Sequence, residues 1–495
     1  MSFVHTKISE NAQTHASAPA IILDGRAISY QTVENSVLNA MKWLAGANVS
    51  RGMVVALSLS DAVLQLYLTL ALLRMGAIQA TLDPRLPDAD FRSLAAKLGV
   101  QLVVREARST RAESVTAVLA PKREILETGP SSRLDSSDLN EDDMALLYHG
   151  SGTTGEPKII GLSHRRLYSR CSNLAGDFPL FPGDRSMILQ RHTSPTYLTR
   201  AMQSLFFAGC LIEVSSMRNR TGNYFESLCH AIDQCRVDHL SGTAFHAKSI
   251  VHKLARSGAK IRFPHLKTFL VGASPVSRVL RETVIQRVTP NLCINYGTNE
   301  AGTISRASPA FLKRHFDSVG GVFPNSEVAI FDPSGKRLDS GQEGMVAVRG
   351  NSVISRYEGD EAANKSAFRD GWFRTGDIGY LGEEGALYLL GRYDDMIIVD
   401  GTNVFPSEIE KVIDSLAAVK ESAVIGIYSD LGKDAIVAFV VLRRRSSEAQ
   451  IIDACKQQLG WKSPQQVFFV EALPRNFAGK ILRKELAKLI TVAAS

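Results

Sequence analysis

The 495-residue sequence lacks the cysteine pattern of a zinc site or of a disulfide-stabilised protein. Its six cysteines, at positions 171, 210, 229, 235, 293 and 455, include no CxxC pair. We therefore expect free thiols, as is typical of a reducing compartment, and predict a cytoplasmic protein.

The sequence also lacks a long uninterrupted apolar run. Residues 1–20 show no basic start followed by an apolar core, so no signal peptide is expected. The most apolar stretch, Met53–Leu82, contains two charged residues and Gly76, which argues against a membrane span. We interpret it instead as a strand over Met53–Leu59, then a buried helix with Ser60 as its N-cap and Gly76 at its end.

A strong excess of one charge is missing as well. The 57 Lys and Arg against 50 Asp and Glu give a net charge of +7, and the only tight basic run is Arg443–Arg445. So diffuse a charge suits an enzyme that handles phosphates and gives no support for nucleic-acid binding. With 45% hydrophobic and 22% charged residues, the composition is typical of a globular protein. The length of 495 residues corresponds to about three domains or lobes.

Strand-like and helix-like patterns alternate over the first part of the chain. Strands are expected at Leu102–Val104, Met144–Tyr148, Lys158–Leu162, Leu211–Val214 and Lys267–Val271, and helices at Tyr224–Cys235 and Ala244–Ala255. The second and third of these strands flank a turn rich in small residues and are expected to form a hairpin. Strands separated by helices favour α/β layers with largely parallel sheets.

From about residue 319 the pattern changes. Short strands between Gly-rich turns, at Glu327–Asp332, Gly344–Arg349 and Ala386–Leu390, indicate a β-rich lobe. After a charged junction at Gly391–Asp395, we expect helices at Pro406–Leu416 and Glu448–Leu459 and strands at Glu421–Ile427 and Ile436–Leu442. This tail of about 100 residues is long enough for an independent small domain.

The strongest chemical signal is the segment Tyr148–Lys158, YHGSGTTGEPK. Its three glycines let the backbone approach an anion, and its three hydroxyls and successive N–H groups can surround phosphate oxygens. Lys158 adds a positive charge, but it comes two positions too late after Gly155 for a Walker A loop. We predict a phosphate-binding loop; the alternative is a hairpin turn made of small residues.

This loop resembles the phosphate loop of the adenylate-forming superfamily, which contains acyl-CoA synthetases, adenylation domains that load carrier proteins, and beetle luciferases. The resemblance extends from about Ala18 to Leu489. Its further motifs are Asp24–Tyr30, Met75–Ala77, Asp83–Pro84, Gly272–Pro275, Tyr296–Glu300, Thr375–Asp377, Gly391–Asp395 and Pro474–Ile481. Taken in this order they are highly specific, although each alone is weak.

The resemblance implies an α/β fold in two domains. Residues 1–391 would form a large adenylating domain of two αβ-layered sheet lobes plus a β-rich lobe. Residues 395–495 would form a small mobile α+β domain that carries the catalytic lysine, with a hinge near residues 392–395. The active site would lie in the cleft between them.

The resemblance also implies an enzyme. Members activate a carboxylic acid by attack on the α-phosphate of ATP, release pyrophosphate and pass the acyl group to a thiol, and ATP, Mg²⁺ and coenzyme A are the implied cofactors. We expect CoA as the acceptor, with a carrier-protein thiol or a non-catalytic nucleotide-binding homologue as alternatives. A small carboxylic acid is the expected partner, without nucleic acid or a membrane span, in a monomer or homodimer.

Residue roles follow from the same resemblance. The phosphate-binding residues would be Ser151, Gly152, Thr153, Thr154, Gly155 and Lys158. The adenine and ribose site would be formed by Gly272, Ala273, Ser274, Tyr296, Gly297, Asp377 and Arg392. Glu300 would bind Mg²⁺, which prefers oxygen ligands, and Asn299, in place of the usual threonine, could donate its amide to the α-phosphate. Lys480 would bridge the carboxylate and the α-phosphate as an electrostatic clamp.

The second half-reaction depends on other positions. Asp394 matches the hinge, and the loop around Gly401 would shape the thiol channel. Asn476 and Ile398 depart from the family pattern, as Asn299 does, and Ile398 bears most on thioester formation because it lies near Gly401.

The acid pocket would be lined by His192, Tyr197, Thr243 and Phe245. Gln190–Gly209 contains no Asp or Glu that could pair an α-ammonium, which argues against an amino-acid substrate. Arg191 and Arg200 could pair a second carboxylate, but such an arginine more often points to solvent. A short to medium aliphatic or an aryl carboxylate is therefore expected.

Overall fold

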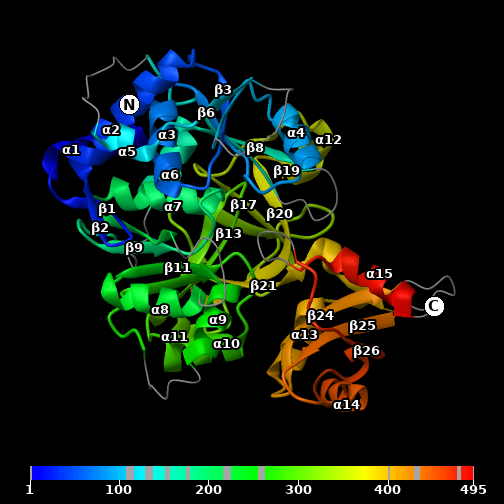
Figure 1. Ribbon diagram of the computed structural model, residues 1–495. Helices are drawn as coiled ribbons and strands as arrows, with labels where there is room; N and C mark the ends of the chain where they lie inside the picture. The colour runs from blue at the N-terminus through cyan, green and yellow to red at the C-terminus, as the bar shows by residue number, and fades with distance from the viewer. Residues whose placement is uncertain are drawn as a thin grey trace.

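The structure is a computed structural model that describes residues 3–106, 116–128, 138–150, 157–173, 179–215, 224–254, 262–399, 402–427, 435–475 and 481–493. Two large sheets with helices around them make up most of the chain, and a smaller sheet with its own helices follows at the C-terminal end (Figure 1). The mixed α/β class, with a large N-terminal and a smaller C-terminal domain, confirms the predicted fold class.

The first sheet has seven strands in the order β18-β8-β7-β4-β3-β5-β6. Its strands are β3 (Val54–Ser58), β4 (Ile78–Thr81), β5 (Leu102–Arg105), β6 (Thr116–Leu119), β7 (Met144–His149), β8 (Ile159–Ser163) and β18 (Tyr357–Glu358). The strands from β7 to β6 are parallel, whereas β8 pairs antiparallel with both β7 and β18. The predicted hairpin is thus confirmed, and a distant two-residue strand is added to its outer edge.

Helices in this first half are α1 (Val4–Thr14), α2 (Tyr30–Gly46), α3 (Ala62–Met75), α4 (Asp88–Lys97), α5 (Arg123–Thr128) and α6 (His164–Ser172). The buried helix α3 ends at Gly76 as predicted, but Ser60 is not its N-cap. The N-cap is Asp61, because its carboxylate accepts hydrogen bonds from the backbone amides of Val63 and Leu64 at 2.9 and 3.0 Å. The Ser60 hydroxyl instead donates to Glu106 Oε1 at 2.5 Å.

The second sheet has fourteen strands, in the order β16-β17-β20-β21-β15-β14-β13-β12-β11-β9-β10-β1-β2, with β19 beside β20. Its bounds are β1 (Pro19–Leu23), β2 (Arg26–Ser29), β9 (Arg185–Ile188), β10 (Cys210–Glu213), β11 (His239–Thr243), β12 (Thr268–Gly272), β13 (Leu292–Thr298), β14 (Gly302–Ala307), β15 (Gly320–Val322), β16 (Ser326–Phe331), β17 (Gly344–Gly350), β19 (Phe368–Arg369), β20 (Trp372–Leu381) and β21 (Ala386–Arg392). The strands from β13 to β1 are parallel. The β-rich lobe is the antiparallel continuation of this sheet and shares its hydrogen bonds through β14.

The remaining helices of this half are α7 (Pro195–Phe206), α8 (Tyr224–Gln234), α9 (Ala244–Leu254), α10 (Arg278–Arg287), α11 (Pro309–Arg314) and α12 (Glu361–Ala367), with short 3₁₀ turns η2 (Glu383–Gly385) and η3 (Tyr393–Asp395). Helix α7 packs against β9 and β10 of the second sheet and against α6 and α1 of the first half. One hydrophobic core therefore runs through α7 and joins the two halves.

The C-terminal part has a hydrophobic core of its own on each face of its sheet. It contains β22 (Ile397–Val399), β23 (Thr402–Val404), β24 (Val419–Ile427), β25 (Ala435–Leu442), β26 (Gln466–Phe469), α13 (Pro406–Ser415), α14 (Glu448–Leu459), η4 (Gly460–Lys462) and α15 (Arg483–Ala493). The predicted order of helices and strands is confirmed here. All six cysteines are free, as predicted. Within the described residues, no helix combines the length and apolar character needed to cross a bilayer.

Candidate active site

The predicted phosphate loop begins and ends where β7 and β8 meet. Gly150 N donates to Lys158 O at 2.9 Å, which closes the base of the loop. Ser151, Gly152, Thr153, Thr154 and Gly155 lie outside the described residues. The two ends of the loop therefore lie at the end of β7 and the start of β8, where Tyr148 contacts Asn299 after β13 of the second sheet.

Three side chains from distant segments gather at this edge. Tyr357 of β18 donates its hydroxyl to Glu300 Oε1 at 3.0 Å, and Lys158 Nζ lies 4.8 Å from the centre of the Tyr357 ring. The same Glu300 oxygen lies 4.0 Å from where a side chain on Gly150 would begin. Burial, reinforced by Glu300, raises the pKa of Tyr357, so the phenol stays protonated and donates. We call Lys158, Glu300 and Tyr357 the anion cluster.

Arg170 of α6 holds the turn that carries Asn299 and Glu300 by hydrogen bonds to its backbone. The Arg170 guanidinium donates to the carbonyls of Asn299 and Glu300 at 3.0 and 2.8 Å and to Ser352 O at 2.9 Å. Tyr148, at the start of the loop motif, also donates to Asn299 O, at 2.8 Å. Three of these four hydrogen bonds hold the backbone of the turn from which the Glu300 side chain projects.

A second group of side chains lies along β13, β20 and β21. Tyr296 donates its hydroxyl to Asp377 Oδ2 at 2.5 Å, and Arg392 Nη1 lies 3.2 Å from Asp377 Oδ1. Arg392 also donates to Thr375 O at 2.9 Å, and Asp377 and Arg392 are direct partners in the register of β20 and β21. Burial first, and then the Asp377 charge, raise the pKa of Tyr296. We call Tyr296, Asp377 and Arg392 the ribose cluster.

Glycines line the edge between these clusters because the backbones approach closely there. A side chain on Gly272 would begin 2.5 Å from Asn295 O, and one on Gly297 would begin 2.2 Å from Gly302 O. Ala273, which follows Gly272, has a φ of 65°, and Ser274 after it is exposed. Gly272 and Gly297 therefore stand where close backbone packing leaves no space for a side chain.

The predicted acid-pocket residues are only partly brought together. His192 lies edge-on to Tyr197 with ring centres 6.4 Å apart, and its Nε2 is 2.8 Å from Leu59 O. Tyr197 is 3% exposed and its hydroxyl donates to Glu213, so it is part of the core. Thr243, the last residue of β11, hydrogen-bonds His246 Nδ1 at 3.0 Å, and Phe245 in α9 is 42% exposed.

Sequence reasoning missed Arg170 and Tyr357. Neither lies in a motif, and Tyr357 belongs to a two-residue strand that only sheet pairing with β8 positions. Lys480, the predicted catalytic lysine, and Gly401, predicted to shape the thiol channel, lie outside the described residues. Asp394 is in η3, between the last strand of the large sheet and β22.

Comparison with known families shows which family the chain belongs to. The model of the AMP-binding enzyme family matches residues 8–358, and that of the AMP-binding enzyme C-terminal domain matches residues 408–480. The chain belongs to the AMP-binding enzyme family. The predicted resemblance to adenylate-forming enzymes is confirmed, and with it the prediction that the chain is an enzyme of the acyl-CoA ligase type.

Individual members of the AMP-binding enzyme family are similar over nearly the whole chain. A 4-coumarate–CoA ligase of rice (Oryza sativa) is 28% identical over 93% of this chain and 87% of its own length. A 2-succinylbenzoate–CoA ligase of Bacillus cereus is 27% identical over 95% of both chains. Among solved structures, ATP-bound MatB of Rhodopseudomonas palustris superposes with a TM-score of 0.88 at 25% identity, covering 98% of each chain.

Proposed function

We propose that this protein is an ATP-dependent acid–CoA ligase. It activates a carboxylic acid as an acyl-adenylate, with release of pyrophosphate, and then transfers the acyl group to the thiol of coenzyme A. The observation that carries the proposal is two sets of side chains, a cation and a carboxylate beside the phosphate loop and a half-buried Asp–Arg–Tyr set on the second sheet. The names of the curated relatives, both acid–CoA ligases, support CoA as the acceptor.

The ribose cluster fits a nucleoside. Asp377 is held by Tyr296 and Arg392 and keeps further acceptor capacity on its two oxygens, as a carboxylate that binds a diol needs. Adenine would stack on Tyr296, with Gly272, Ala273, Ser274 and Gly297 forming the rest of its site. Nucleoside binding at this place would orient the α-phosphate toward the turn that carries Asn299.

The anion cluster fits magnesium triphosphate. Within the described residues no three metal-ligating side chains gather, so a closed protein cage for a metal is not formed there. Mg²⁺ usually keeps its waters and binds one or two carboxylates plus phosphate oxygens, which is what Glu300 beside the phosphate loop provides. The bound ion would neutralise phosphate charge; Lys158 would pair the β- and γ-phosphates that leave together.

The domain boundaries belong to the same proposal. We place the adenylating domain at residues 1–391, the C-terminal domain at residues 395–495 and the hinge at residues 392–395. Lys480 would enter for adenylation, and rotation about Asp394 would exchange it for the loop around Gly401, which opens the thiol channel. We also propose that the enzyme works in the cytoplasm as a monomer or homodimer.

Pyrophosphate release tests the function. The protein is supplied with ATP and Mg²⁺ across a panel of aliphatic and aryl carboxylic acids, each with and without CoA. We expect one class of acid to give pyrophosphate and an acyl-CoA, with a rate that rises with CoA. Release that ignores CoA would contradict CoA as the acceptor, and silence with every acid while ATP still binds would contradict catalysis.

A further inference from the structure

Two buried histidines meet where α1 packs against α6. His5 of α1 is 6% exposed, and His164, the first residue of α6, is 2% exposed. Their ring centres lie 5.9 Å apart, and the ring of Phe3 is stacked on His5 and edge-on to His164. We call His5 and His164 the histidine pair. It belongs to neither of the two clusters of the candidate active site.

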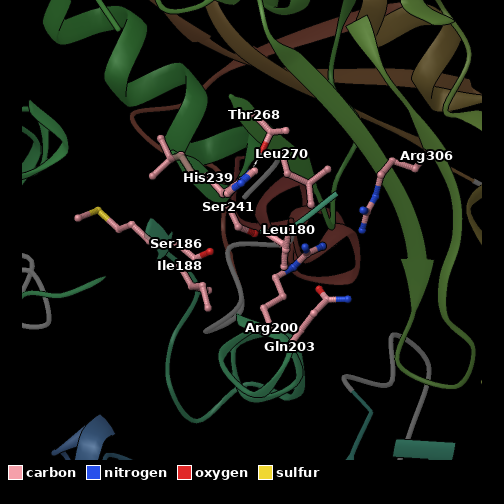
Figure 2. Close-up of a pocket in the computed structure, with 12 residues that line it drawn as sticks. Leu180, Ser186, Ile188, Arg200, Gln203, His239, Ser241, Thr268, Leu270 and Arg306 are labelled. Carbon is pink, nitrogen blue, oxygen red and sulfur yellow. Dashed lines mark hydrogen bonds between the residues drawn. The ribbon is translucent and has the colours of Figure 1, made fainter. Parts of the chain in front are cut away.

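The histidine pair lacks partners that would accept a proton's charge. Among the described residues, neither His5 Nδ1 nor His164 Nε2 has a hydrogen-bond partner, although both atoms are buried. His239 is different, because Asp184 Oδ2 lies 3.0 Å from one of its ring nitrogens and Thr268 Oγ1 lies 2.9 Å from the other (Figure 2). A buried imidazole whose nitrogens meet no acceptor stays neutral, since nothing compensates for the loss of hydration.

From α3 and α2, the charges next to the pair are Arg74 and Glu34. Burial, then Arg74 and then His164 lower the pKa of His5 to about 3. The Arg74 guanidinium already holds both oxygens of Glu34, at 2.8 and 2.6 Å, and also donates to Ser9 of α1. A proton on His5 would therefore place a second positive charge beside a fixed one.

On the side of α6, Asp143 acts on His164. Burial lowers the pKa of His164 to about 4, although the Asp143 charge opposes this. Asp143 is shared with another cation, since Arg51 Nη2 lies 2.7 Å from its Oδ2. His164 also stands at the N-terminus of α6, where the helix dipole disfavours a positive charge.

Other charged groups on the surrounding helices have partners of their own: Lys7 with Glu10, Arg165 with Glu141 and Asp142, and Arg166 with the Val353 carbonyl. Helix α7 contains one charged residue, Arg200, which lines a cavity beside β9 and β11 (Figure 2). This corrects the expectation that Arg200 points to solvent. Arg191, which precedes this helix, lies 3.1 Å from Asp83 Oδ2. None of these groups supplies an anion to the pair.

Helix α1 depends on its packing for stability. It has 11 residues, and a helix of this length is marginal by itself in water. Besides the histidine pair, Asn11 fastens it to α7 by donating to the carbonyls of Leu205 and Phe206 at 2.7 and 2.9 Å. Loss of the contact with α6 would therefore affect the whole helix.

Acid favours the release of α1. The docked histidines have pKa values of about 3 and about 4, whereas the ordinary pKa of histidine is 6.5. As the pH falls below 6.5, the released state gains protons that the docked state does not, so docking weakens. Between pH 7.5 and pH 5.0, the equilibrium constant for release rises about 30-fold for each histidine that reaches water.

We propose that the histidine pair is an acid-sensitive latch. Protonation of His5 and His164 releases α1 and loosens the start of α6. Arg170, later on the same helix, then holds the Asn299–Glu300 turn less firmly. The rest of the chain stays folded, and α1 docks again when the pH rises. The latch itself does not depend on the proposed function; its effect on catalysis does.

Hydrogen exchange of the full chain, followed by mass spectrometry, tests the latch. The protection factor of the α1 amides, corrected for the intrinsic exchange rate, is compared at pH 7.5 and pH 5.0. We expect it to fall by about 30-fold or more, while the far-ultraviolet circular dichroism signal is retained. Equal protection at the two pH values would overturn the latch, and so would loss of the whole dichroism signal, which is general acid unfolding.

Variants assign the effect to the pair. His5→Phe combined with His164→Phe keeps the ring packing and removes both protons, so α1 protection should change less than about threefold between the two pH values. His5→Phe alone should remove about 30-fold of the change. His252→Gln, exposed on α9, is the matched control and should keep the wild-type change. Asn11→Ala weakens docking without a titrating group, so it should lower protection equally at both pH values. A pH dependence that survives in the double variant would overturn the latch.

Catalysis tests the link to the site. Pyrophosphate release is measured at pH 7.5, at pH 5.0 and after return to pH 7.5. At pH 5.0 the wild type should be slower than the double phenylalanine variant by about tenfold or more, and its rate should recover on return. Equal rates for both proteins at pH 5.0 would overturn the link to the turn. The expected exchange result in a protein that releases no pyrophosphate at any pH would overturn the proposed function and leave the latch.

Discussion

At the scale of single residues, the anion end of the site depends on the Tyr357 phenol. It contacts two charged groups that ATP chemistry needs, the Glu300 carboxylate at 3.0 Å and the Lys158 ammonium above its ring. A hydroxyl that donates to a carboxylate fixes its orientation, while the ring face stabilises the cation without neutralising it. We therefore propose that Tyr357 positions Glu300 and Lys158 for Mg²⁺ and for the leaving phosphates.

Removing the Tyr357 hydroxyl tests this role. Tyr357→Phe should lower kcat for pyrophosphate release about tenfold and raise the Mg²⁺ concentration needed for half-maximal rate, because one charge-assisted hydrogen bond is lost. Tyr380→Phe, a change to a tyrosine that stacks on Tyr388 away from the loop, is the matched control. A Tyr357→Phe enzyme with an unchanged Mg²⁺ requirement would show that Glu300 is oriented by other contacts.

At the scale of secondary-structure elements, α6 is the support of the catalytic turn. Its Arg170 donates to three carbonyls from two different loops, so the helix fixes the Asn299–Glu300 turn against the segment around Ser352. The same helix begins directly after β8, the second strand of the phosphate-loop hairpin. One helix, α6, therefore connects to the hairpin of the phosphate loop and also holds the Asn299–Glu300 turn.

Arg170→Met should destabilise the protein by about 3 kcal/mol or more, since buried carbonyls lose a donor at roughly 1–3 kcal/mol each. ATP use should fall as well, because the Glu300 carboxylate is no longer held. Urea unfolding followed by circular dichroism measures the first effect and the KM for ATP the second. Arg165→Gln, on the exposed side of the same helix, is expected to change both little. A stable Arg170→Met protein with normal ATP use would contradict the supporting role of α6.

Elements were the part of the fold that local sequence patterns predicted best. The β7–β8 hairpin, the helix α3 and the order of elements after Pro406 all follow from periodicity, glycine positions and caps. The predicted N-cap of α3 is one residue early, because Ser60 and Asp61 are both favourable N-cap residues. In the structure, the Ser60 hydroxyl binds Glu106 and Asp61 caps the helix.

At the scale of the whole molecule, polar contacts between the C-terminal part and the large domain are present on α13 among the described residues. Ser407 donates to Leu390 O, and Asp414 of α13 lies 4.0 Å from Lys248 of α9. Burial raises the pKa of Asp414 to about 6, although Lys248 and the Ser422 hydroxyl act against this. The charge state of one carboxylate therefore affects the contact between the two parts near neutral pH.

This contact predicts a pH-dependent stability with a definite sign. The Asp414 carboxyl holds its proton more tightly in the folded protein than in the unfolded chain, where its pKa is near 3.8. The free energy of unfolding therefore falls as the pH rises from about 4 through 6. Asp414→Asn removes the charge and should stabilise the protein by about 2–3 kcal/mol at pH 7.5 and little at pH 4.5. Urea unfolding at the two pH values measures this. Asp453→Asn, exposed on α14, is the control; an equal effect of Asp414→Asn at both pH values would refute it.

The proposed rotation of the C-terminal part separates the two half-reactions. Lys480→Ala should slow acyl-adenylate formation at least a hundredfold, as expected for a lost charge at the transition state, and spare thioester formation from a supplied acyl-adenylate. Asp394→Pro should do the reverse, because it stiffens the hinge. Pre-steady-state measurement of each step distinguishes them. Equal losses in both steps for either variant would contradict the assigned role.

The sequence alone determined the family and the order of many elements, because family motifs and the periodic patterns of helices and strands are local features of the chain. Only the tertiary structure revealed Tyr357 and Arg170. Their partner lies far along the chain, because Glu300 is 57 residues from Tyr357 and 130 residues from Arg170. Burial and strand register decide what such residues contact, and both arise only when the sheets form.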